Sequence, residues 1–210
     1  MTRFSDRRDA GRRLAAKLTS LQGADAVVLG LPRGGVPVAY EISRALQVSL
    51  DVLLVRKLGV PSHSELAMGA IGEDDVRVLN NDVIYRERIT PAELARVERR
   101  ERDELARRAV RYRGSRPPVP LAGRVAIVVD DGVATGATAR AACAVASLRG
   151  AARIVLAVPV MSSDAARLLA DDVDELVAVS VPDWFGSVGN FYRDFRATQD
   201  DEVVALLAGP

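Results

Sequence analysis

Short runs of apolar residues alternate along the chain with longer segments in which apolar positions recur every three to four residues. The short runs are rich in Val, Ile and Leu and are bounded by Gly, Pro or Asp, which is typical of strands buried in a parallel sheet. We predict five such strands, at residues 26–31, 50–55, 125–129, 154–158 and 173–179. Because the segments between them predict helices, the pattern indicates an α/β fold with an open parallel sheet flanked by helices.

The pattern changes between the second and third of these strands. Two apolar runs, at residues 67–71 and 76–79, are separated by a Gly-Glu-Asp-Asp turn and predict a hairpin beside the sheet. A long helix is then predicted, because Thr90 can cap its first turn and Glu93 can complete a capping box. We expect this helix to extend to about Tyr112.

Composition limits the classes of protein to consider. The chain has 210 residues, 49% of them hydrophobic and 27% charged, as in a globular protein with a full core. A formal net charge of +1 argues against strong nonspecific attraction to nucleic acid. The charged opening residues do not resemble a signal peptide, and no apolar run approaches the roughly 20 residues that span a membrane. Cys143, the only cysteine, fits a reducing cytoplasm and lies where a buried apolar side chain is expected.

Candidate chemistry is concentrated at residues 127–138, which read Ile-Val-Val-Asp-Asp-Gly-Val-Ala-Thr-Gly-Ala-Thr. A β-branched run ends in Asp130 and Asp131, and a turn then leads into a helical segment. The turn offers backbone N–H groups and the hydroxyls of Thr135 and Thr138 to a phosphate, and the helix dipole adds to the attraction. Carboxylates suit hydroxyl groups, or a cation bound to a polyanion. The alternative without a binding role is an ordinary strand end followed by a glycine turn.

A second loop with anion-binding character follows the first strand. Two glycines, Gly34 and Gly35, let the backbone approach an anion closely, and Arg33 could neutralise its charge. Taken alone, this motif is equally well explained by a plain turn. If strands 26–31 and 125–129 are neighbours, both loops lie at the carboxyl ends of parallel strands, where open α/β sheets bind ligands.

The acidic stretch closely resembles the phosphoribosyl-diphosphate (PRPP) motif of type I phosphoribosyltransferases. The resemblance implies that Asp130 and Asp131 bind the ribose hydroxyls, together with Mg²⁺ as the metal ion. The implied 5′-phosphate loop comprises Ala134, Thr135, Gly136, Ala137 and Thr138. The implied pyrophosphate loop comprises Arg33, Gly34 and Gly35, with a non-proline cis peptide expected between Pro32 and Arg33. Members that salvage purines carry an acid where this chain has Ala134, which puts purine salvage of that type in doubt.

Two further segments resemble parts of this family. Arg56 and Lys57 are similar to an Arg-Lys pair that leads into a mobile loop in orotate phosphoribosyltransferases, which implies that they hold pyrophosphate and that Lys57 acts in catalysis. His63 is consistent with that loop or with a solvated basic loop. Trp184 and Phe185 resemble the hood of hypoxanthine-type members, in which an aromatic ring stacks on the base.

The alternative for the hood is an aromatic mini-core, to which we assign Phe191, Tyr192 and Phe195. No lysine corresponds to the one that reads a purine's exocyclic oxygen in the hypoxanthine-type branch, so the sequence leaves the acceptor base open. Residues 96–116 hold nine arginines interleaved with acids. Spacings of three and four residues predict an exposed, ion-paired helix, with an RNA-contacting surface as the alternative.

The resemblance covers nearly the whole chain. The opening Phe4-Ser5-Asp6-Arg7 also looks like a group of bacterial phosphoribosyltransferase-domain proteins of unassigned substrate. We expect one domain across residues 1–210, with a core at about 22–180, a hairpin and long-helix insertion at about 57–120, and a small C-terminal hood at about 181–199.

The sequence therefore predicts a cytoplasmic enzyme. It would use PRPP and Mg²⁺ to transfer a 5-phosphoribosyl group to a nitrogenous, base-like small molecule and release pyrophosphate, with a homodimer left open. The alternative is a non-catalytic regulator that binds PRPP or a nucleotide and acts on RNA or a protein partner. An acceptor screen that follows pyrophosphate release separates the two.

Overall fold

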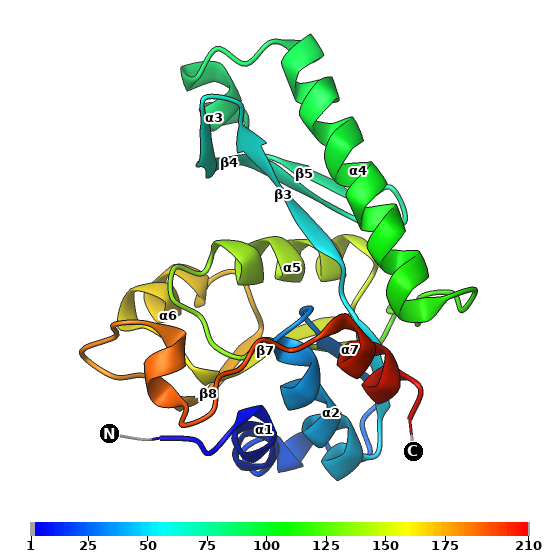
Figure 1. The fold of residues 1–210 in the computed structure, drawn as a ribbon, viewed down its shortest axis with the longest axis vertical. Coiled ribbons are helices and arrows are strands. Elements are labelled where there is room, and N and C mark those ends of the chain that lie inside the picture. Colours follow the sequence, from blue (N-terminus) through cyan, green and yellow to red (C-terminus); the bar gives the residue numbers. More distant parts are fainter. Residues whose placement is uncertain (1–2, 210) are drawn as a thin grey trace.

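The computed structural model describes residues 3–209, apart from the side chain of residue 65. Its main sheet has five parallel strands in the order β2-β1-β6-β7-β8 (Figure 1). The strands are β1 (Ala26–Gly30), β2 (Ser49–Val52), β6 (Val125–Val129), β7 (Arg153–Val160) and β8 (Glu175–Ser180). The expected open parallel sheet is confirmed, and β1 lies beside β6 with Gly30 opposite Val129.

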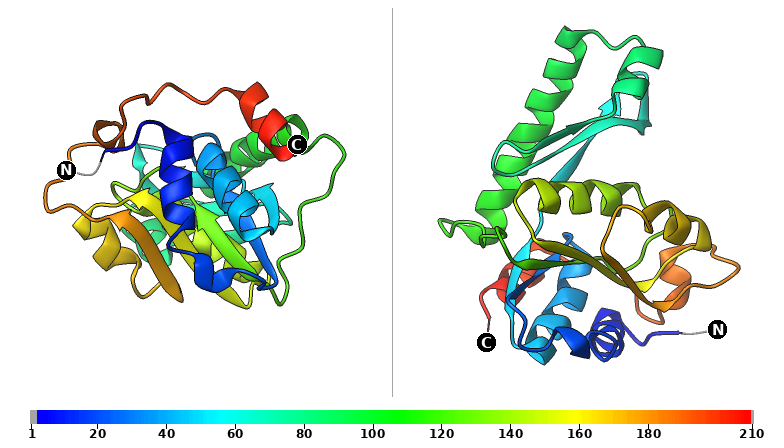
Figure 2. Two further views of the ribbon diagram at one scale, coloured as in Figure 1. Left: turned by 90° about the horizontal axis from the view of Figure 1, so that it is seen from below. Right: turned by 180° about the vertical axis from the view of Figure 1, so that it is seen from behind.

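Helices cover both faces of the main sheet. One face carries α1 (Arg7–Ala15), η1 (Thr19–Leu21) and α2 (Gly35–Leu46), and the other carries α5 (Ala137–Leu148) and α6 (Ser163–Leu169) (Figure 2). Alternate strand residues face opposite sides. Val28 packs with Leu14 and Ile42 on the first side, and Val128 packs with Cys143 on the second. Cys143 is buried, as its place in an alanine-rich helix predicts.

A smaller lobe projects from this sheet (Figure 1). It contains β3 (Val55–Val60), β4 (His63–Gly72) and β5 (Arg77–Leu79), which form an antiparallel sheet, together with α3 (Asn81–Arg86) and α4 (Pro91–Arg113). The expected hairpin is present, but a third strand joins it. The apolar run at residues 50–55 predicts one strand, whereas the chain passes there from β2 in the main sheet to β3 in the lobe.

This passage between sheets has a physical reason. Leu53 and Leu54 are both buried, but they belong to different cores, one under α5 and the other in the lobe. A continuous apolar run is therefore compatible with a change of sheet, and hydrophobicity alone cannot locate it. The change also places Arg56 and Lys57 within a strand instead of ahead of a mobile loop, and His63 at the start of β4.

The long helix α4 has the predicted beginning and surface. The Glu93 N–H donates to Thr90 Oγ1 at 3.2 Å, and the Thr90 N–H donates to Glu93 Oε2 at 2.9 Å, which completes the capping box. Acids four residues before arginines form ion pairs along the helix, such as Glu104 Oε1 with Arg108 Nε at 2.7 Å. The expectation of an ion-paired helix is thus confirmed for most of its length.

Arg113, the last residue of α4, departs from that expectation because it is buried. Its guanidinium donates to Asp51 Oδ1 at 2.7 Å, to the Val52 carbonyl oxygen at 2.6 Å and to both carboxylate oxygens of Glu73. Asp51 Oδ2 also accepts from the Val119 N–H at 2.9 Å. This cluster ties the end of α4, β2 and the β4–β5 turn together at the base of the lobe.

The first residues of the described chain pair with a segment near residues 191–194. The Phe4 N–H donates to the Phe191 carbonyl oxygen at 2.8 Å, and the Arg193 N–H donates back to the Phe4 carbonyl oxygen at 2.9 Å. Phe4, Phe191 and Tyr192 form a small buried cluster beside η2 (Val188–Phe191). The chain then continues to α7 (Asp200–Leu207), which the sequence analysis does not predict. Among residues 3–209, the helices are too short or too polar to cross a membrane.

Candidate functional site

The two predicted ligand loops meet at the carboxyl edge of the main sheet. Because β1 and β6 are adjacent and parallel, the loop after β1 begins beside the acidic pair. The Leu31 N–H extends this pairing by donating to the Val129 carbonyl oxygen at 2.8 Å. The peptide bond between Pro32 and Arg33 is cis, which confirms the expectation drawn from the family resemblance.

Gly34 and Gly35 are required by close approach to the acidic pair. A Cβ atom on Gly34 would overlap Asp131 Oδ2, and one on Gly35 would overlap the Val129 carbonyl oxygen and lie 2.9 Å from the Asp130 Cα. Any side chain at either position would therefore displace the loop from the carboxylates. The backbone expected to bind pyrophosphate and the acids expected to bind ribose thus form one continuous surface.

The acidic pair is only partly accessible, and its charge is opposed by one arginine. Arg7 donates to Asp131 Oδ2 through Nε at 2.8 Å and Nη2 at 2.7 Å. Burial, and then the neighbouring Asp131 carboxylate, raise the pKa of Asp130 above its usual range. Burial also raises the pKa of Asp131, and the Arg7 guanidinium opposes that rise. The pair therefore favours ligands that bring hydrogen-bond donors or positive charge to it.

The turn after the acids leads into the N-terminus of α5. Gly136 caps this helix with a left-handed φ of 82°, a conformation that favours glycine. The first backbone N–H to donate within the helix is that of Arg140, to the Gly136 carbonyl oxygen at 2.8 Å. Within the described chain, the N–H groups of residues 134–139 have no backbone acceptor. With the exposed side chains of Thr135 and Thr138, they form a helix end of the kind at which anions are bound.

The turn is itself anchored from the neighbouring strand end. The Val133 N–H donates to the Val160 carbonyl oxygen at 2.9 Å, and Ser162 Oγ donates to the Ala134 carbonyl oxygen at 2.6 Å. These bonds fix the turn against the end of β7. Ser162 is a contributor to the site that the sequence analysis does not identify.

The basic residues expected to hold pyrophosphate lie in different surroundings. The Arg33 side chain is 44% exposed, and its Nη1 lies 3.9 Å from Asp200 Oδ1 at the start of α7. Arg56 is bonded to Glu101 of α4 through Nε at 2.8 Å and Nη2 at 2.6 Å. Successive residues of a strand face opposite sides, so Lys57 faces the side on which Val55 packs near α5. The structure therefore separates Arg56 from Lys57.

The aromatic residues of the hood divide into buried and exposed members. The Phe185 ring lies 5.3 Å from the Phe191 ring and packs against the small cluster that contains Phe4, Phe191 and Tyr192. Trp184 is 69% exposed. Phe191 and Tyr192 are buried, as expected for a mini-core, whereas Phe195 is partly exposed and its ring lies 5.0 Å from that of Tyr192. Trp184 is thus the most exposed of these aromatic side chains.

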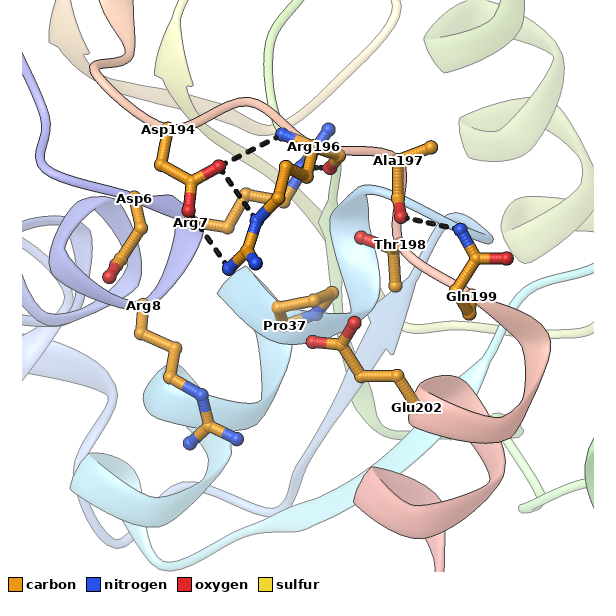
Figure 3. Close-up of a pocket in the computed structure, with 10 residues that line it drawn as sticks. All are labelled: Asp6, Arg7, Arg8, Pro37, Asp194, Arg196, Ala197, Thr198, Gln199 and Glu202. Carbon is orange, nitrogen blue, oxygen red and sulfur yellow. Dashed lines mark hydrogen bonds and ion pairs between the residues drawn. The ribbon is translucent and has the colours of Figure 1, made fainter.

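A cavity of about 480 Å³ lies between the start of α1, the start of α2 and residues 194–199 (Figure 3). Its lining mixes basic and acidic side chains: Arg7, Arg8 and Arg196 face Asp6, Asp194 and Glu202. None of the residues proposed for the site from sequence lines it. The cavity is connected to the acidic pair through Arg7, which lines it and also bonds to Asp131.

Arg7 is the main residue of the site that sequence reasoning missed. The opening Phe-Ser-Asp-Arg motif carries a signal, since Asp6 caps α1 by accepting from the Asp9 N–H at 2.8 Å and so fixes the position of Arg7. Nothing in the local pattern reveals a partner 124 residues away. Among the described residues, no group of three or more metal-ligating side chains accompanies the acidic pair.

Comparisons with known proteins agree with this geometry. The family model of the phosphoribosyl transferase domain matches residues 4–196. A Mycobacterium tuberculosis protein named "Putative phosphoribosyl transferase" is 56% identical over 207 residues, which cover 99% of this chain and 47% of that protein. The chain thus spans about half the length of the curated relatives it matches.

Solved structures share the fold. A crystal structure of a protein from Thermus thermophilus is 47% identical in sequence, with a TM-score of 0.89 and 98% of each chain covered. A protein of Aquifex aeolicus has a TM-score of 0.51 at 9% identity, over 87% of this chain and 78% of that one, and this likeness concerns the fold alone.

Proposed function

The chain belongs to the phosphoribosyl transferase domain family, and on that premise we propose that it transfers a 5-phosphoribosyl group from PRPP to a nitrogenous acceptor. The observation that carries the proposal is the convergence of three features at one sheet edge. These are the acidic pair, the glycine loop packed against it, and the open N-terminus of α5. Together they match a ligand that bears a diol between two phosphate groups.

Each feature receives one part of PRPP in this proposal. Asp130 and Asp131 accept hydrogen bonds from the ribose hydroxyls. The 5′-phosphate binds the turn at residues 134–138, where the N–H groups have no backbone acceptor among the described residues and the side chains of Thr135 and Thr138 are exposed. Pyrophosphate lies against residues 33–35. We also assign Lys57 of β3 to the pyrophosphate, the role that the resemblance of the Arg-Lys pair implies, while Arg56 is bonded to Glu101 of α4.

In the reaction, the bond from the ribose C1 to the pyrophosphate oxygen breaks, and a bond forms from C1 to the acceptor nitrogen, which loses a proton. Positive charge develops on the ribose ring and negative charge on the leaving group. The protein's part is to hold the reactants in line and to stabilise these charges. Asp130 and Asp131 suit the first charge, and Arg33 and Lys57 suit the second.

The donor set also suits Mg²⁺ in the manner usual for phosphate substrates. Mg²⁺ is commonly bound through one or two carboxylates plus substrate oxygens, and we assign this role to Asp130 and Asp131. When bound, the ion would neutralise pyrophosphate charge. The acceptor is proposed to stack on Trp184, the most exposed aromatic residue of the hood.

The test is a calorimetric titration with PRPP and Mg²⁺, followed by an acceptor screen. Purines, pyrimidines, nicotinate-like pyridines and orotate would each be incubated with PRPP while pyrophosphate release is measured. We expect binding of PRPP and turnover with one class of acceptor. An absence of PRPP binding at millimolar concentration would contradict the proposal, whereas binding without turnover would leave only a PRPP-binding role.

A further inference from the structure

Arg7 is held on three sides at the edge of the acidic pair. Nε and Nη2 both donate to Asp131 Oδ2, and Nη1 donates to the Arg196 carbonyl oxygen at 2.6 Å. The guanidinium carbon lies 4.0 Å from the centre of the Phe195 ring, and the side chain is 11% exposed. The guanidinium therefore has a fixed position and orientation, which is what a planar five-donor group can provide and an ammonium group cannot.

The bonds leave the two oxygens of Asp131 unequal. Both donors of Arg7 end on Oδ2, and neither of them is directed at Oδ1. The Asp131 carbonyl oxygen is also held, since Tyr192 Oη donates to it at 2.5 Å. The residue is thus fixed at its backbone and at one carboxylate oxygen, and the other oxygen remains to accept a hydrogen bond.

This arrangement lies directly against the pyrophosphate loop. A Cβ atom on Gly34 would overlap Asp131 Oδ2 and would lie 3.3 Å from Arg7 Nε. A rotation of the Asp131 carboxylate would therefore change the surface offered to both ribose and loop. In a site that acts by holding its reactants in a fixed orientation, such a displacement of the carboxylate should weaken binding of the reactants.

A purely structural role for Arg7, in which it only joins α1 to the segment after η2, does not account for its bond to Asp131. The segments that it could join are already joined by backbone bonds from Phe4 to Phe191 and Arg193, and by the Asp194 N–H to the Ser5 carbonyl oxygen at 3.0 Å. Phe4 and Tyr192 also pack together, with ring centres 5.3 Å apart. The bond to Asp131 is additional to this junction and is directed at the acidic pair.

We propose that Arg7 is a positioning residue for Asp131, which fixes one carboxylate oxygen so that the other faces the ribose hydroxyls of PRPP. The inference rests on the proposed function and adds to it a residue from outside the motifs that carry the family resemblance. It predicts that Arg7 matters for ligand binding only through Asp131.

The experiment is a double-mutant cycle, with the dissociation constant for PRPP and Mg²⁺ measured by calorimetry. Arg7→Met should weaken PRPP binding by about tenfold in the wild-type background, yet by less than about twofold when Asp131→Asn is already present. Arg8→Met is the matched control, because Arg8 is the next residue of α1 and pairs with Glu41 instead. We expect that control to bind PRPP as the wild type does.

The outcomes separate the two proposals. If wild-type protein does not bind PRPP, the proposed function fails and this inference fails with it. If wild type binds and Arg7→Met binds equally well, only the inference fails. Equal losses in both backgrounds would make Arg7 a direct ligand contact or a structural clamp, and would overturn the positioning role.

A second variant keeps the proposal testable if Arg7→Met does not fold. The thermal unfolding midpoint of each variant shows whether it is folded. Arg7→Lys retains the charge but not the two-donor fork. We expect its PRPP affinity to lie between those of wild type and Arg7→Met. Should Arg7→Met fail to fold, wild-type affinity in Arg7→Lys would overturn the proposal.

Discussion

At Asp131, three segments far apart in sequence contact one residue. Arg7 approaches from α1, Gly34 from the loop after β1, and Tyr192 from the segment after η2. The carboxylate is therefore shaped by its neighbours before any ligand arrives. Substitutions that retain its size and change its chemistry should affect binding more than folding.

The substitution Asp131→Asn tests this expectation, because it keeps the size of the side chain and replaces one carboxylate oxygen by an NH₂ group. We expect PRPP binding to weaken at least about tenfold, or roughly 1.4 kcal/mol, because an amide presents a donor where the carboxylate accepts. Calorimetry measures the affinity, and the thermal unfolding midpoint should change little. Asp82→Asn, an exposed acid at the start of α3, is the control. An unchanged affinity in Asp131→Asn would remove this residue from the site.

Cys143 provides a second test at this scale. Burial raises the pKa of its thiol to about 12, with the Asp172 carboxylate as the lesser cause. Since the thiolate is the reactive form, only about one thiol in 10,000 would be ionised at pH 8 even if reagent could reach it. We expect native protein to resist an aromatic disulfide reagent, and urea-unfolded protein to react fully. Rapid labelling of the native protein would contradict the buried position.

Trp184 offers a spectroscopic test, because it is the only tryptophan and is 69% exposed. If it forms one wall of the acceptor pocket, a planar heterocycle should quench its fluorescence, and should do so well only when PRPP or ribose 5-phosphate is present. The heterocycle should bind after the sugar phosphate because, in this proposal, the sugar forms the floor of the acceptor pocket. Phe185→Ala serves as a comparison: an increase in KM for both substrates would indicate a disturbed hood, not a lost stacking contact.

At the level of elements, α4 shows which features could be predicted from sequence and which could not. Its start follows from Thr90 and Glu93, whose capping box is local. Its ion pairs follow from spacing along the helix. Arg113 belongs to the same arginine-rich pattern, yet it is buried against Asp51 and Glu73. Those partners come from β2 and the β4–β5 turn, and a periodic pattern carries no information about such distant contacts.

Arg113→Met should destabilise the protein much more than the loss of an exposed arginine of α4. Removal of the guanidinium would leave Asp51 and Glu73 buried without their charge partner, so we expect a loss of about 3–5 kcal/mol in the free energy of unfolding. Arg107→Met, which removes an exposed pair with Glu104, should change that free energy by less than about 1 kcal/mol. Urea denaturation measures both. Similar small effects would show that the Arg113 cluster does not hold the lobe in place.

The same division between local and distant signals applies to the whole molecule. The parallel sheet, the acidic pair beside the glycine loop and the cis peptide at Pro32 follow from patterns within a dozen residues and from the family resemblance. The sequence does not reveal the change of sheet at residues 53–54, the separation of Arg56 from Lys57, or the bond from Arg7 to Asp131. Each depends on how elements pack, which apolar periodicity does not specify.

The junction between residues 4–5 and 191–194 affects the order in which the site forms during synthesis. During synthesis, Asp131 emerges from the ribosome about 60 residues before Tyr192 and Phe195, and long-range contacts of this kind form late because the intervening chain must first be ordered. A nascent chain can therefore build the sheet and the turn at residues 134–138 while Asp131 still lacks its contact with Tyr192, and Arg7 lacks its contact with Phe195. The proposed site is complete only when the segment that contacts Arg7 has been made.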